Sequence, residues 1–592
     1  MKTALRTHTC GQLRKSDAGS RTRLCGWVAK VRDHGGVLFV DLRDRYGRTQ
    51  VVFRPENAPL AARAAALRGE SCVAVEGAVS ARPADAVNRE LPTGEIEVLA
   101  DSLEIMNVAR VPPFEVGDRN EAALEVRLRH RHLDLRRPSL QRNLLLRSRF
   151  LLAVRNALAS RAFVEIETPI LTKATPEGAR DFLVPSRVTP GTFYALPQSP
   201  QLFKQVLMVA GFDRYFQVAR CFRDEDLRAD RQPEFTQIDL EMAFVDPEGI
   251  RETIEHALAA GFREAFGIEV SAPFPRLRHA EVVERYGVDK PDLRYGLPLV
   301  DVGEEAAASE FRTFRDVLEA GGRVAGIRVP GAGSWTRRQI DEWTARATEL
   351  GAKGLAPLKV EGSDLAGAIA KFFEPPLRAR MRERLEAEPG DLLFFVAGPA
   401  AIVHRTLGAL RTEIADRLGL ADEKTFRFAW VVDFPLFEWS EEDRRWQSSH
   451  HPFTAPVDEA LPELESAPAA LVSQSFDLVL NGVELGSGGM RIHKAPLQER
   501  IFAFLGIGAA EARDRFGFLL EALSDGAPPH GGFAVGVDRI VQIALGLDGI
   551  RDGIAFPKTA SGACLFTGAP SAVPSGQLAE LHIQPAPSRN RS

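Results

Sequence analysis

Charged side chains of both signs follow two stretches that are predicted to be neighbouring strands of one sheet. Arg223 and Glu225 share one strand parity in "RCFRDE", and Asp239 and Glu241 share one in "EFTQIDLEM". Alternate residues of a strand project from the same face, and guanidinium groups grip phosphate oxygens in a planar fork. This pattern therefore indicates a site for a polyphosphate. The alternative is a solvated hairpin with surface ion pairs, the usual explanation of a charged run.

Two later clusters favour the ligand-binding explanation. In "GGFAVGVDR", glycines allow close approach of a flat ligand, and Arg539 opens a predicted helix from which it can reach a terminal phosphate. In "FDLVLNGVELGSGGMRIH", Asp477 and Glu484 offer the hard oxygen ligands that suit magnesium between ATP phosphates. Each cluster alone also fits a structural explanation, a glycine-rich edge strand under a helix or two acids at a sheet edge.

Composition limits the kind of protein that can carry these clusters. A chain of 592 residues predicts about three or four domains. The net charge is -5, so contact with nucleic acid must come from local patches. The 5 cysteines are scattered without metal or redox spacing, which indicates a reducing compartment. No run of about 18 apolar residues is present, so we expect a cytoplasmic protein without a membrane partner.

The order of predicted elements suggests how the chain is organised. Residues 21–106 contain five short β-rich runs with a helix after the third, which is the order of an OB-fold barrel. After a proline-rich linker, a helix leads into short apolar runs that alternate with helices, as in a mostly antiparallel α+β domain. Residues 288–425 interrupt this pattern with few convergent polar groups, and we predict an inserted α+β module there.

Three segments resemble, in order, the three motifs of class II aminoacyl-tRNA synthetases: "FVEIETPIL" with Pro169, "FRDED" and "GGFAVGVDR". Five more, "ILTKATPEGARDF", "LPQSPQLFKQ", "TQIDLEM", "HHPFT" and "NGVELGSGGMRIH", narrow the resemblance to bacterial-type aspartyl-tRNA synthetases of subclass IIb. The resemblance covers about residues 3–568. One departure is Ser487 and Gly489, where the family usually has glycine and serine, and it leaves Arg491 in register.

The resemblance implies a multidomain α+β fold that combines an OB-fold barrel, an antiparallel-sheet catalytic domain of the class II type and the inserted module. The first motif also implies a homodimer. The expected domains are an anticodon-binding OB-fold (1–106), a hinge (107–138), the catalytic domain in two parts (139–287 and 426–568), the inserted module (288–425) and a C-terminal tail (569–592).

For L-aspartate, the resemblance implies a pocket with cations for the side-chain carboxylate. Lys204 and Arg491 match those cations, and Asp239 would hold Lys204 in place. Either of the two neighbouring histidines could contact the substrate, or be an ordinary loop residue. The residues that match the aspartate pocket are Glu177, Ser199, Gln201, Lys204, Arg223, Asp239, His450, His451 and Arg491.

For ATP, the resemblance implies that Arg223 and Arg539 are the catalytic residues, because they would neutralise charge that builds on the phosphates. Phe235 would stack on adenine, and Asp477 with Glu484 would bind Mg2+. The aspartate carboxylate would attack the α-phosphorus, and tRNA would then take the aspartyl group. The residues that match the ATP site are Arg223, Asp224, Glu225, Gln232, Phe235, Glu484, Gly536, Val537, Asp538 and Arg539.

The OB-fold barrel would read the tRNA anticodon, with bases stacked on an aromatic side chain. Phe39 matches the stacking position, and its neighbours in sequence take the core face, which leaves Phe39 outside. The alternatives for Phe39 are a core residue or a lone exposed apolar one. The matching residues are Arg32, His34, Phe39, Gln50, Asp85 and Glu97.

Two of these residues bear on which tRNA is charged. His34 stands where synthetases restricted to tRNA-Asp more often have leucine, and no lysine lies near Asp85, where the restricted type often has one. Both favour the relaxed type, which charges tRNA-Asp and tRNA-Asn. The restricted type stays open, because His34 could also be a plain loop residue.

Two other functions compete with this prediction. An asparaginyl or lysyl synthetase of the same subclass would face an uncharged or cationic side chain, which Lys204 with Arg491 argues against. A synthetase paralogue that makes asparagine or only binds RNA typically loses the OB domain or a motif arginine, and this chain keeps both. DNA is not an expected partner.

Overall fold

The computed structural model describes residues 2–175, 178–225 and 231–584. Glu177, one of the predicted aspartate contacts, lies outside these residues. The chain divides into two compact units, each described here by itself. The first takes residues 1–148, 227–232 and 547–572, and the second takes residues 149–226, 233–546 and 573–592.

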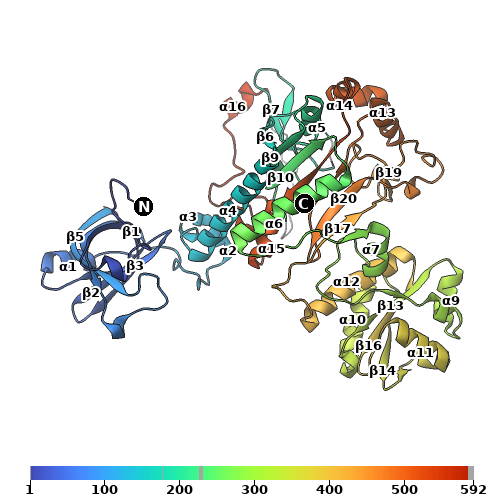
Figure 1. Cartoon of the computed structure of the whole chain (residues 1–592), viewed down its shortest axis with the longest axis horizontal. Helices are drawn as coiled ribbons and strands as arrows, with labels where there is room; N and C mark the ends of the chain where they lie inside the picture. The colour runs from blue at the N-terminus through green and yellow to red at the C-terminus, as the bar shows by residue number, and fades with distance from the viewer. Residues whose placement is uncertain (1, 176–177, 226–230, 585–592) are drawn as a thin grey trace. The chain divides into compact units, whose positions relative to one another are not determined.

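A closed five-stranded barrel forms most of the first unit, with strand order β1-β2-β3-β5-β4 (Figure 1). The predicted OB-fold is therefore confirmed. Leu38, Val40 and Leu42 point into its core, as their alternation predicts, and Phe39 between them is only half-buried. The elements are η1 (Lys15–Asp17), β1 (Arg21–His34), β2 (Val37–Asp44), β3 (Gly47–Phe53), α1 (Ala58–Ala65), β4 (Cys72–Ala81), η2 (Ala84–Ala86) and β5 (Ile96–Asn107).

Short helices follow the barrel and are held by buried charge. Arg131 and Asp134 form a fully buried ion pair at 2.5 Å, and Arg131 also donates to the carbonyl oxygens of Ile554 and Ala555 at 2.8 and 2.9 Å. A distant segment of chain is thereby fixed to these helices. The elements are α2 (Leu124–Arg129), α3 (Arg131–Asp134), the start of α4 (Pro138–Ser160) and η6 (Ile550–Gly553).

An eight-stranded sheet is the centre of the second unit. All its neighbours pair antiparallel except the two end pairs, β11 with β17 and β6 with β9, which are parallel. The predicted mostly antiparallel sheet is therefore confirmed. In spatial order the strands are β11 (Arg276–Arg278), β17 (Phe428–Val432), β20 (Ser475–Leu480), β21 (Val483–Met490), β22 (His530–Gly536), β10 (Glu234–Ala243), β9 (Arg214–Phe222) and β6 (Val164–Glu165).

Helices cover this sheet, and their ends follow from local sequence. In α6 (Pro247–Phe266), the Asp246 side chain accepts a hydrogen bond from the Gly249 amide, and Gly267 ends the helix at φ 70°. The other elements of this part are α5 (Gln201–Val209), α7 (His279–Tyr286), α13 (Ala495–Phe504), α14 (Ala509–Ser524), α15 (Val537–Leu545), η5 (Pro468–Ala470) and the hairpins β7 (Leu183–Pro185) with β8 (Phe193–Ala195) and β18 (Phe437–Ser440) with β19 (Arg445–Ser448).

The inserted segment builds a five-stranded sheet of its own, in the order β12-β13-β16-β14-β15 (Figure 1). Alternate residues of β16 fill two apolar cores: Phe394 faces one and Phe395 the other. Its elements are β12 (Val300–Asp301), α8 (Gly303–Ala307), α9 (Arg312–Glu319), β13 (Arg323–Val329), η3 (Ala332–Ser334), α10 (Arg337–Glu349), β14 (Ala356–Glu361), β15 (Asp364–Ala366), η4 (Ala370–Phe372), α11 (Pro375–Arg384), β16 (Leu392–Gly398) and α12 (Ala400–Leu418).

The C-terminal segment, expected to be a tail, carries one short helix, α16 (Ser575–Glu580). Within residues 2–175, 178–225 and 231–584, no helix is both long enough and apolar enough to cross a membrane.

Candidate active site

The centre of the large sheet positions the two acidic residues of β10. Asp239 lies opposite Gln217 on β9 and Ala534 on β22, while Glu241 lies opposite Tyr215 and Gly532. Because β10 is paired on both sides and covered by α5, both carboxylates are completely buried. Burying a carboxylate is costly unless it is paired with a positive charge, so both residues require cations as partners.

Lys204 and Arg491 are these partners. Together with Asp239 and Glu241 they form what we call the charge cluster. The Lys204 Nζ atom from α5 lies 3.0 Å from Asp239 Oδ2 and 3.2 Å from Glu241 Oε2. Arg491, just after β21, donates from Nε to Glu241 Oε1 at 2.9 Å. All four side chains are at most 2% exposed. The structure thus brings together the predicted residues Lys204, Asp239 and Arg491.

The two carboxylates of the cluster differ in acidity. Burial raises the pKa of Asp239 to about 6, against the opposing effect of Lys204. Burial acts on Glu241 in the same direction, but the charges of Arg491 and Lys204 outweigh it and lower the pKa of Glu241. Asp239 Oδ1 is buried without a hydrogen-bond partner in the described part of the chain. Asp239 is therefore the group in the cluster that can take up a proton near neutral pH.

Sequence reasoning gave Glu241 no role, although it holds both cations of the cluster. The available signal was its strand parity, which it shares with Asp239. Gly532 on β22 makes room for it: a Cβ atom there would lie 1.9 Å from Glu241 Oε2 and 2.1 Å from the Leu240 carbonyl oxygen. Glycine at this position is a steric requirement.

The two neighbouring histidines face different partners. His451 Nε2 lies 2.8 Å from Arg491 Nη1. Because a guanidinium only donates, His451 Nε2 must accept there, while Nδ1 lies 3.2 Å from the Phe453 amide nitrogen, a second donor, and 3.3 Å from Thr454 Oγ1. Burial, and then the charge of Arg491, lower the pKa of His451 well below its usual value. His451 is therefore a neutral group at the charge cluster.

His450 instead contacts the acidic residue predicted to bind magnesium. Its Nε2 atom lies 2.9 Å from Asp477 Oδ1, and its Nδ1 atom lies 3.2 Å from Ser475 Oγ. Burial opposes protonation of His450, but the hydrogen bond and charge of Asp477 prevail and raise its pKa. The structure thus places His451 beside the aspartate-pocket residues and His450 beside the metal candidates.

Asp477 and Glu484, on the adjacent strands β20 and β21, sit close enough to repel each other. Burial, and then the charge of Asp477, raise the pKa of Glu484. Arg539 donates from Nη1 to the Glu484 carbonyl oxygen at 2.7 Å. A divalent cation would relieve this repulsion, and two carboxylates supply hard oxygen ligands. The described residues hold no group of three or more histidine, cysteine or acidic side chains suited to a metal, so the pair fits magnesium only if phosphate or water completes the coordination.

On the hairpin, the predicted ATP residues Arg223 and Phe235 are in contact. The Arg223 guanidinium lies 5.3 Å from the centre of the Phe235 ring. Arg223 Nε is buried and has no hydrogen-bond partner among the described residues. An arginine held by stacking, with a donor left over, is suited to an incoming anion.

The other ATP candidates near the hairpin lie in different settings. Asp538, in the first turn of α15 after Gly536 and Val537, accepts from the Thr236 amide at 3.2 Å and so joins α15 to β10. The Asp224 amide donates to the Arg180 carbonyl at 3.0 Å. Glu225, after β9, is half-buried.

Gln232 belongs to the first unit, where its side-chain amide forms hydrogen bonds with the backbone of Lys558. The Lys558 amide donates to Gln232 Oε1 at 2.7 Å, and Gln232 Nε2 donates to the Lys558 carbonyl at 3.2 Å. The predicted role of Gln232 in ATP binding would require this pair of bonds to be shared or exchanged.

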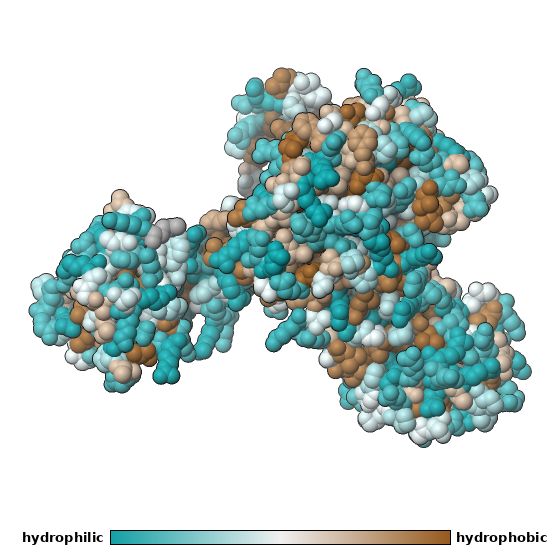
Figure 2. Space-filling view, in the orientation of Figure 1, coloured by the Kyte–Doolittle hydropathy of each residue, from teal (hydrophilic) through white to brown (hydrophobic). Residues whose placement is uncertain are grey.

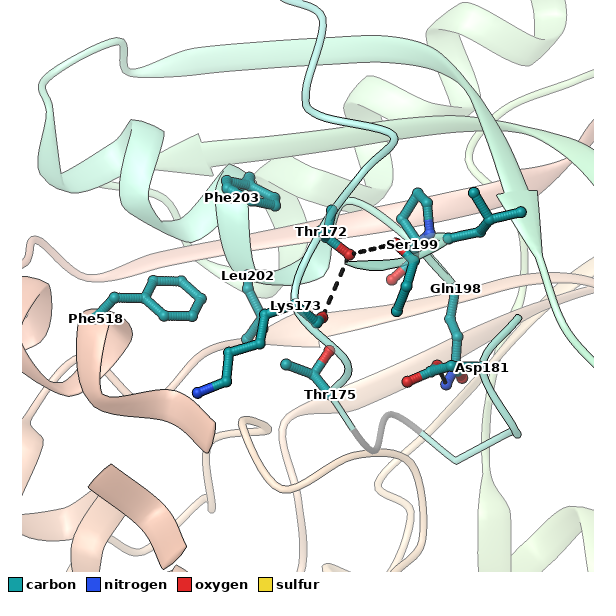
Figure 3. A pocket seen from close by; sticks show the side chains of 12 residues that line it. Thr172, Lys173, Thr175, Asp181, Gln198, Ser199, Leu202, Phe203 and Phe518 are labelled. Carbon is teal, nitrogen blue, oxygen red and sulfur yellow. Dashed lines mark hydrogen bonds between the residues drawn. The ribbon is translucent and has the colours of Figure 1, made fainter. Parts of the chain in front are cut away.

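A small cavity of about 50 Å³ lies beside Ser199 (Figure 3). Four of its lining residues are in contact in pairs: Gln198 Nε2 donates to Asp181 Oδ1 at 2.5 Å, and Phe203 and Phe518 stack with ring centres 6.3 Å apart. The buried Gln201 Nε2 has no partner in the described residues. Gln201 is not among the residues that line this cavity, and its buried, unpaired amide donor is costly, which leaves a hydrogen bond to offer, as its predicted role in the aspartate pocket requires.

On the barrel, four polar side chains form what we call the outer network: Arg32, Asp41, Gln50 and Glu97. Arg32 Nη2 donates to Asp41 Oδ1 at 2.8 Å and to Gln50 Oε1 at 3.3 Å, and Gln50 Nε2 donates to Glu97 Oε2 at 3.1 Å. Three of the predicted anticodon residues therefore lie in one chain of hydrogen bonds, and the fourth member, Asp41, is covered by arginines rather than exposed.

The predicted stacking residue adjoins this network. Phe39 on β2 pairs in register with Arg32 on β1, and the His34 ring meets the Phe39 ring edge-on at 5.8 Å. Asp85 lies exposed in η2. The face of the barrel shown in Figure 2 is largely hydrophilic with scattered apolar residues, as expected of a surface that meets a polar partner.

Comparison with known proteins assigns both units. Residues 123–560 match the family of tRNA synthetases class II (D, K and N), and residues 22–106 match the OB-fold nucleic acid binding domain. The sequence motifs had indicated the same two families.

Whole-chain relatives are similar in sequence along nearly their full length. The chain is 52% identical to an aspartate–tRNA(Asp/Asn) ligase of Desulfatibacillum aliphaticivorans, covering 98% of this chain and 97% of the relative. It is 53% identical to the protein of that name from Geobacillus sp. (strain WCH70), with 98% of each covered. It is also 52% identical to an aspartate–tRNA ligase of Geobacillus kaustophilus, again with 98% of each covered.

Solved structures agree in fold. The asparaginyl-tRNA synthetase of Pyrococcus horikoshii, complexed with asparaginyl-adenylate, aligns with a TM-score of 0.58 at 18% identity, over 93% of this chain and 98% of that one. The asparaginyl-tRNA synthetase of Entamoeba histolytica aligns with a TM-score of 0.57 at 16% identity, over 92% and 97%.

Proposed function

The chain belongs to the class II tRNA synthetases of the aspartate, lysine and asparagine group, and on this premise we propose that it attaches L-aspartate to tRNA through an aspartyl adenylate. One observation carries the choice of amino acid: Lys204 and Arg491 are buried in one cluster, 1% and 2% exposed. When Asp239 is protonated, these two cations face the single carboxylate of Glu241, and the positive charge left over suits an acidic side chain rather than a neutral or cationic one.

The negative charge of the substrate fits this cluster because Asp239 can be neutralised. With its pKa raised to about 6, Asp239 takes up a proton when a further carboxylate arrives. Lys204 is then shared between the substrate and Glu241. Neutral His451, held by Arg491, adds a polar group without adding charge.

In the first step, the α-carboxylate of aspartate attacks the α-phosphorus of ATP, and pyrophosphate leaves. Arg223 and Arg539 counter the charge on the phosphates, and Phe235 offers adenine a flat surface. Asp477 and Glu484 would hold magnesium, which would supply further charge neutralisation. In the second step, a hydroxyl of the terminal adenosine of tRNA attacks the adenylate carbonyl.

Substitution of Arg223 tests the ATP site. We expect Arg223→Ala to lower aspartate-dependent ATP–pyrophosphate exchange by roughly 10²–10³-fold, as for the loss of one preorganised donor. Arg220→Ala is the matched control, because Arg220 is exposed on the same strand and pairs with Glu234 at 2.5 Å. Near-normal exchange by Arg223→Ala, or exchange driven by asparagine as well as by aspartate, would overturn the assignment.

The range of tRNA substrates is a second part of the proposal. We propose that the enzyme charges both tRNA-Asp and tRNA-Asn, because His34 adjoins the stacking residue Phe39 and no lysine lies near Asp85. Relatives with the same 52% identity are named aspartate–tRNA(Asp/Asn) ligase in one case and aspartate–tRNA ligase in another. Sequence identity alone therefore does not decide which tRNAs are charged. Charging of purified tRNA-Asp and tRNA-Asn, each with the other as competitor, tests this directly.

We also propose that the enzyme is a cytoplasmic homodimer. Exposed apolar side chains occur in and before the motif 1 segment: Val164 and Leu171 in the motif are 46% and 52% exposed, and Leu152 on the preceding helix α4 is 58% exposed. The five cysteines, all in the described part of the chain, form no disulfide there, in keeping with a reducing compartment. Light scattering on wild type and on Leu171→Asp measures the oligomeric state, and an unchanged mass in the variant would argue against this surface.

A further inference from the structure

Beside the OB barrel, the first unit holds a cavity that the proposed reaction does not use. Its volume is about 500 Å³, which lies in the usual range of small-molecule pockets. Its floor forms where three barrel strands meet, because Trp27 on β1 pairs with Cys72 on β4, and Cys72 pairs with Asn107 at the end of β5. One wall is residues 108–113, and the other is formed by side chains from residues 130–136.

The only acidic side chain among those that line this cavity is already neutralised. Glu70, 7% exposed, receives Arg43 Nη2 on both carboxylate oxygens at 2.6 Å. Arg136 Nη1 donates to the same carboxylate at 2.8 Å. Two guanidinium groups thus share one carboxylate, which leaves one positive charge in excess.

Further cationic or titratable groups line the cavity without adding an acid: Arg110, His130 and His132. Burial lowers the pKa of His132, and the charges of Arg136, His130 and Arg110 lower it further. His132 is thereby kept neutral near pH 7, and the positive charge at the cavity is that of Arg110 together with the excess of the two arginines that share Glu70. Such a concentration of positive charge is stabilised when an anion binds.

The geometry of Arg136 is fixed before any ligand arrives. Its guanidinium lies 4.7 Å from the centre of the Trp27 ring, while Glu70 holds one of its nitrogens. Stacking and pairing together hold the planar fork in one orientation, which suits recognition of phosphate oxygens. The wall at Val108 and Pro112, together with the edge of Trp27, supplies apolar surface for a ring.

The backbone at Glu70 is held in an unfavourable conformation. Its φ is 68°, in the left-handed region that favours glycine, although Glu70 has a side chain. Its amide donates to the Val28 carbonyl oxygen at 2.7 Å, and its carboxylate bonds to two arginines. Strain of this kind concentrates at ligand sites, where surrounding contacts compensate for it.

We propose that this cavity binds a small phosphorylated ligand with a planar ring, of the size of a nucleoside diphosphate. Arg110 and Arg136 would hold the phosphates, and the ring would lie against the Trp27 and Pro112 wall. A single nucleotide is favoured over a run of RNA phosphates, because RNA tracking requires a stripe of cations along a surface, whereas these cations gather around one cavity.

The test is calorimetric titration of GDP into the full-length protein with the active site filled by a non-hydrolysable aspartyl-adenylate analogue. We expect one GDP per chain, and guanosine should bind at least about tenfold more weakly, since charge-assisted bonds to phosphate carry the affinity. Arg110→Gln combined with Arg136→Gln should weaken GDP binding by roughly 10–100-fold. Arg68→Gln is the matched control, an exposed arginine two residues before Glu70 that does not line the cavity.

The single variant Arg110→Gln separates ligand binding from folding, because Arg110 is exposed. This variant should still bind GDP more weakly than wild type, while its rate of adenylate formation stays normal. Absence of GDP binding to the blocked protein would overturn the proposal. Equal affinity of wild type and the arginine variants would do so as well. A loss of tRNA affinity in Arg110→Gln, with no GDP binding in wild type, would assign the cavity to RNA phosphates instead.

Discussion

The charge cluster and the outer network are built from the same kinds of side chain but differ in their surroundings. In the cluster, Lys204 and Asp239 are each 1% exposed. In the network, Arg32 is 36% exposed although its partner Asp41 is covered. A buried pair is strongly coupled and costly to break, whereas a solvent-exposed pair contributes little. Under the proposed function, burial preorganises the cluster for one small anion, and exposure allows the network to exchange its bonds for those of a nucleic-acid base.

Removal of one cation from the cluster should give the largest effect. We expect Lys204→Met to lower aspartate-dependent pyrophosphate exchange by roughly 10²–10³-fold, equivalent to about 3–4 kcal/mol, because it removes one cation of a buried pair. Thermal stability should fall too, because Asp239 and Glu241 would then share Arg491 alone. In the double variant Lys204→Met with Asp239→Asn, one charge of each sign is gone, so stability should recover while exchange does not. Exchange within tenfold of wild type in the single variant would contradict the model.

A change on the outer barrel should affect only the tRNA step. Phe39→Ala should lower kcat/KM for tRNA charging by roughly 10–100-fold, since stacking of one base is worth about 1–3 kcal/mol, and leave pyrophosphate exchange unchanged. Tyr46→Ala serves as the control, because Tyr46 is an exposed aromatic residue of the same barrel outside the network. Equal losses in both variants would point to general damage of the barrel.

Protonation of Asp239 should appear as pH-dependent aspartate binding. Its pKa is raised to about 6 in the free protein, and an added carboxylate should raise it further. Aspartate binding should then take up protons above pH 6, and the affinity should rise as pH falls from 8 toward 6, by up to about tenfold. Titrations in two buffers of different ionisation enthalpy measure the uptake. Asp239→Asn should abolish it, and persistence of the uptake in that variant would assign it to another group.

The smallest effect should come from His34, which lies beside Phe39 and outside the outer network. His34→Leu should lower charging of tRNA-Asn relative to tRNA-Asp by a few fold, about 1 kcal/mol or less, as expected for an exposed contact. Competition between the two purified tRNAs measures this ratio. A ratio equal to that of wild type would remove His34 from the specificity argument and leave the restricted type open.

Strand alternation allowed much of this architecture to be predicted. Leu38, Val40 and Leu42 identified the barrel core because side chains of a strand point to alternate faces. The same rule placed Asp239 and Glu241 on one face of β10. It could not give Glu241 a partner, because Arg491 lies 250 positions later in the chain and meets Glu241 only through the order of strands in the sheet.

The two neighbouring histidines also show that contacts between distant segments cannot be predicted from the local sequence. His450 and His451 are adjacent in a loop, where no periodicity fixes the direction of a side chain. Their assignment depends on Asp477 and Arg491, which reach them from β20 and from the end of β21. Likewise, the alternation that leaves Phe39 outside puts Asp41, two residues later, on the same outer face, but it does not reveal that Arg32 and Arg48 pair with Asp41 there.

Gly532 has a consequence for how the preference for an acidic amino acid could change. A Cβ atom there would collide with Glu241 and with the backbone of β10, so the orientation of Glu241, and through it of both cations, depends on a residue without a side chain. Exchange of charged residues in the cluster would not by itself convert the enzyme to a neutral amino acid, because the strand spacing would remain fitted to a carboxylate. A change of amino-acid substrate therefore requires at least two coordinated substitutions. Variants with only one of them should be poor at charging either aspartate or the neutral amino acid.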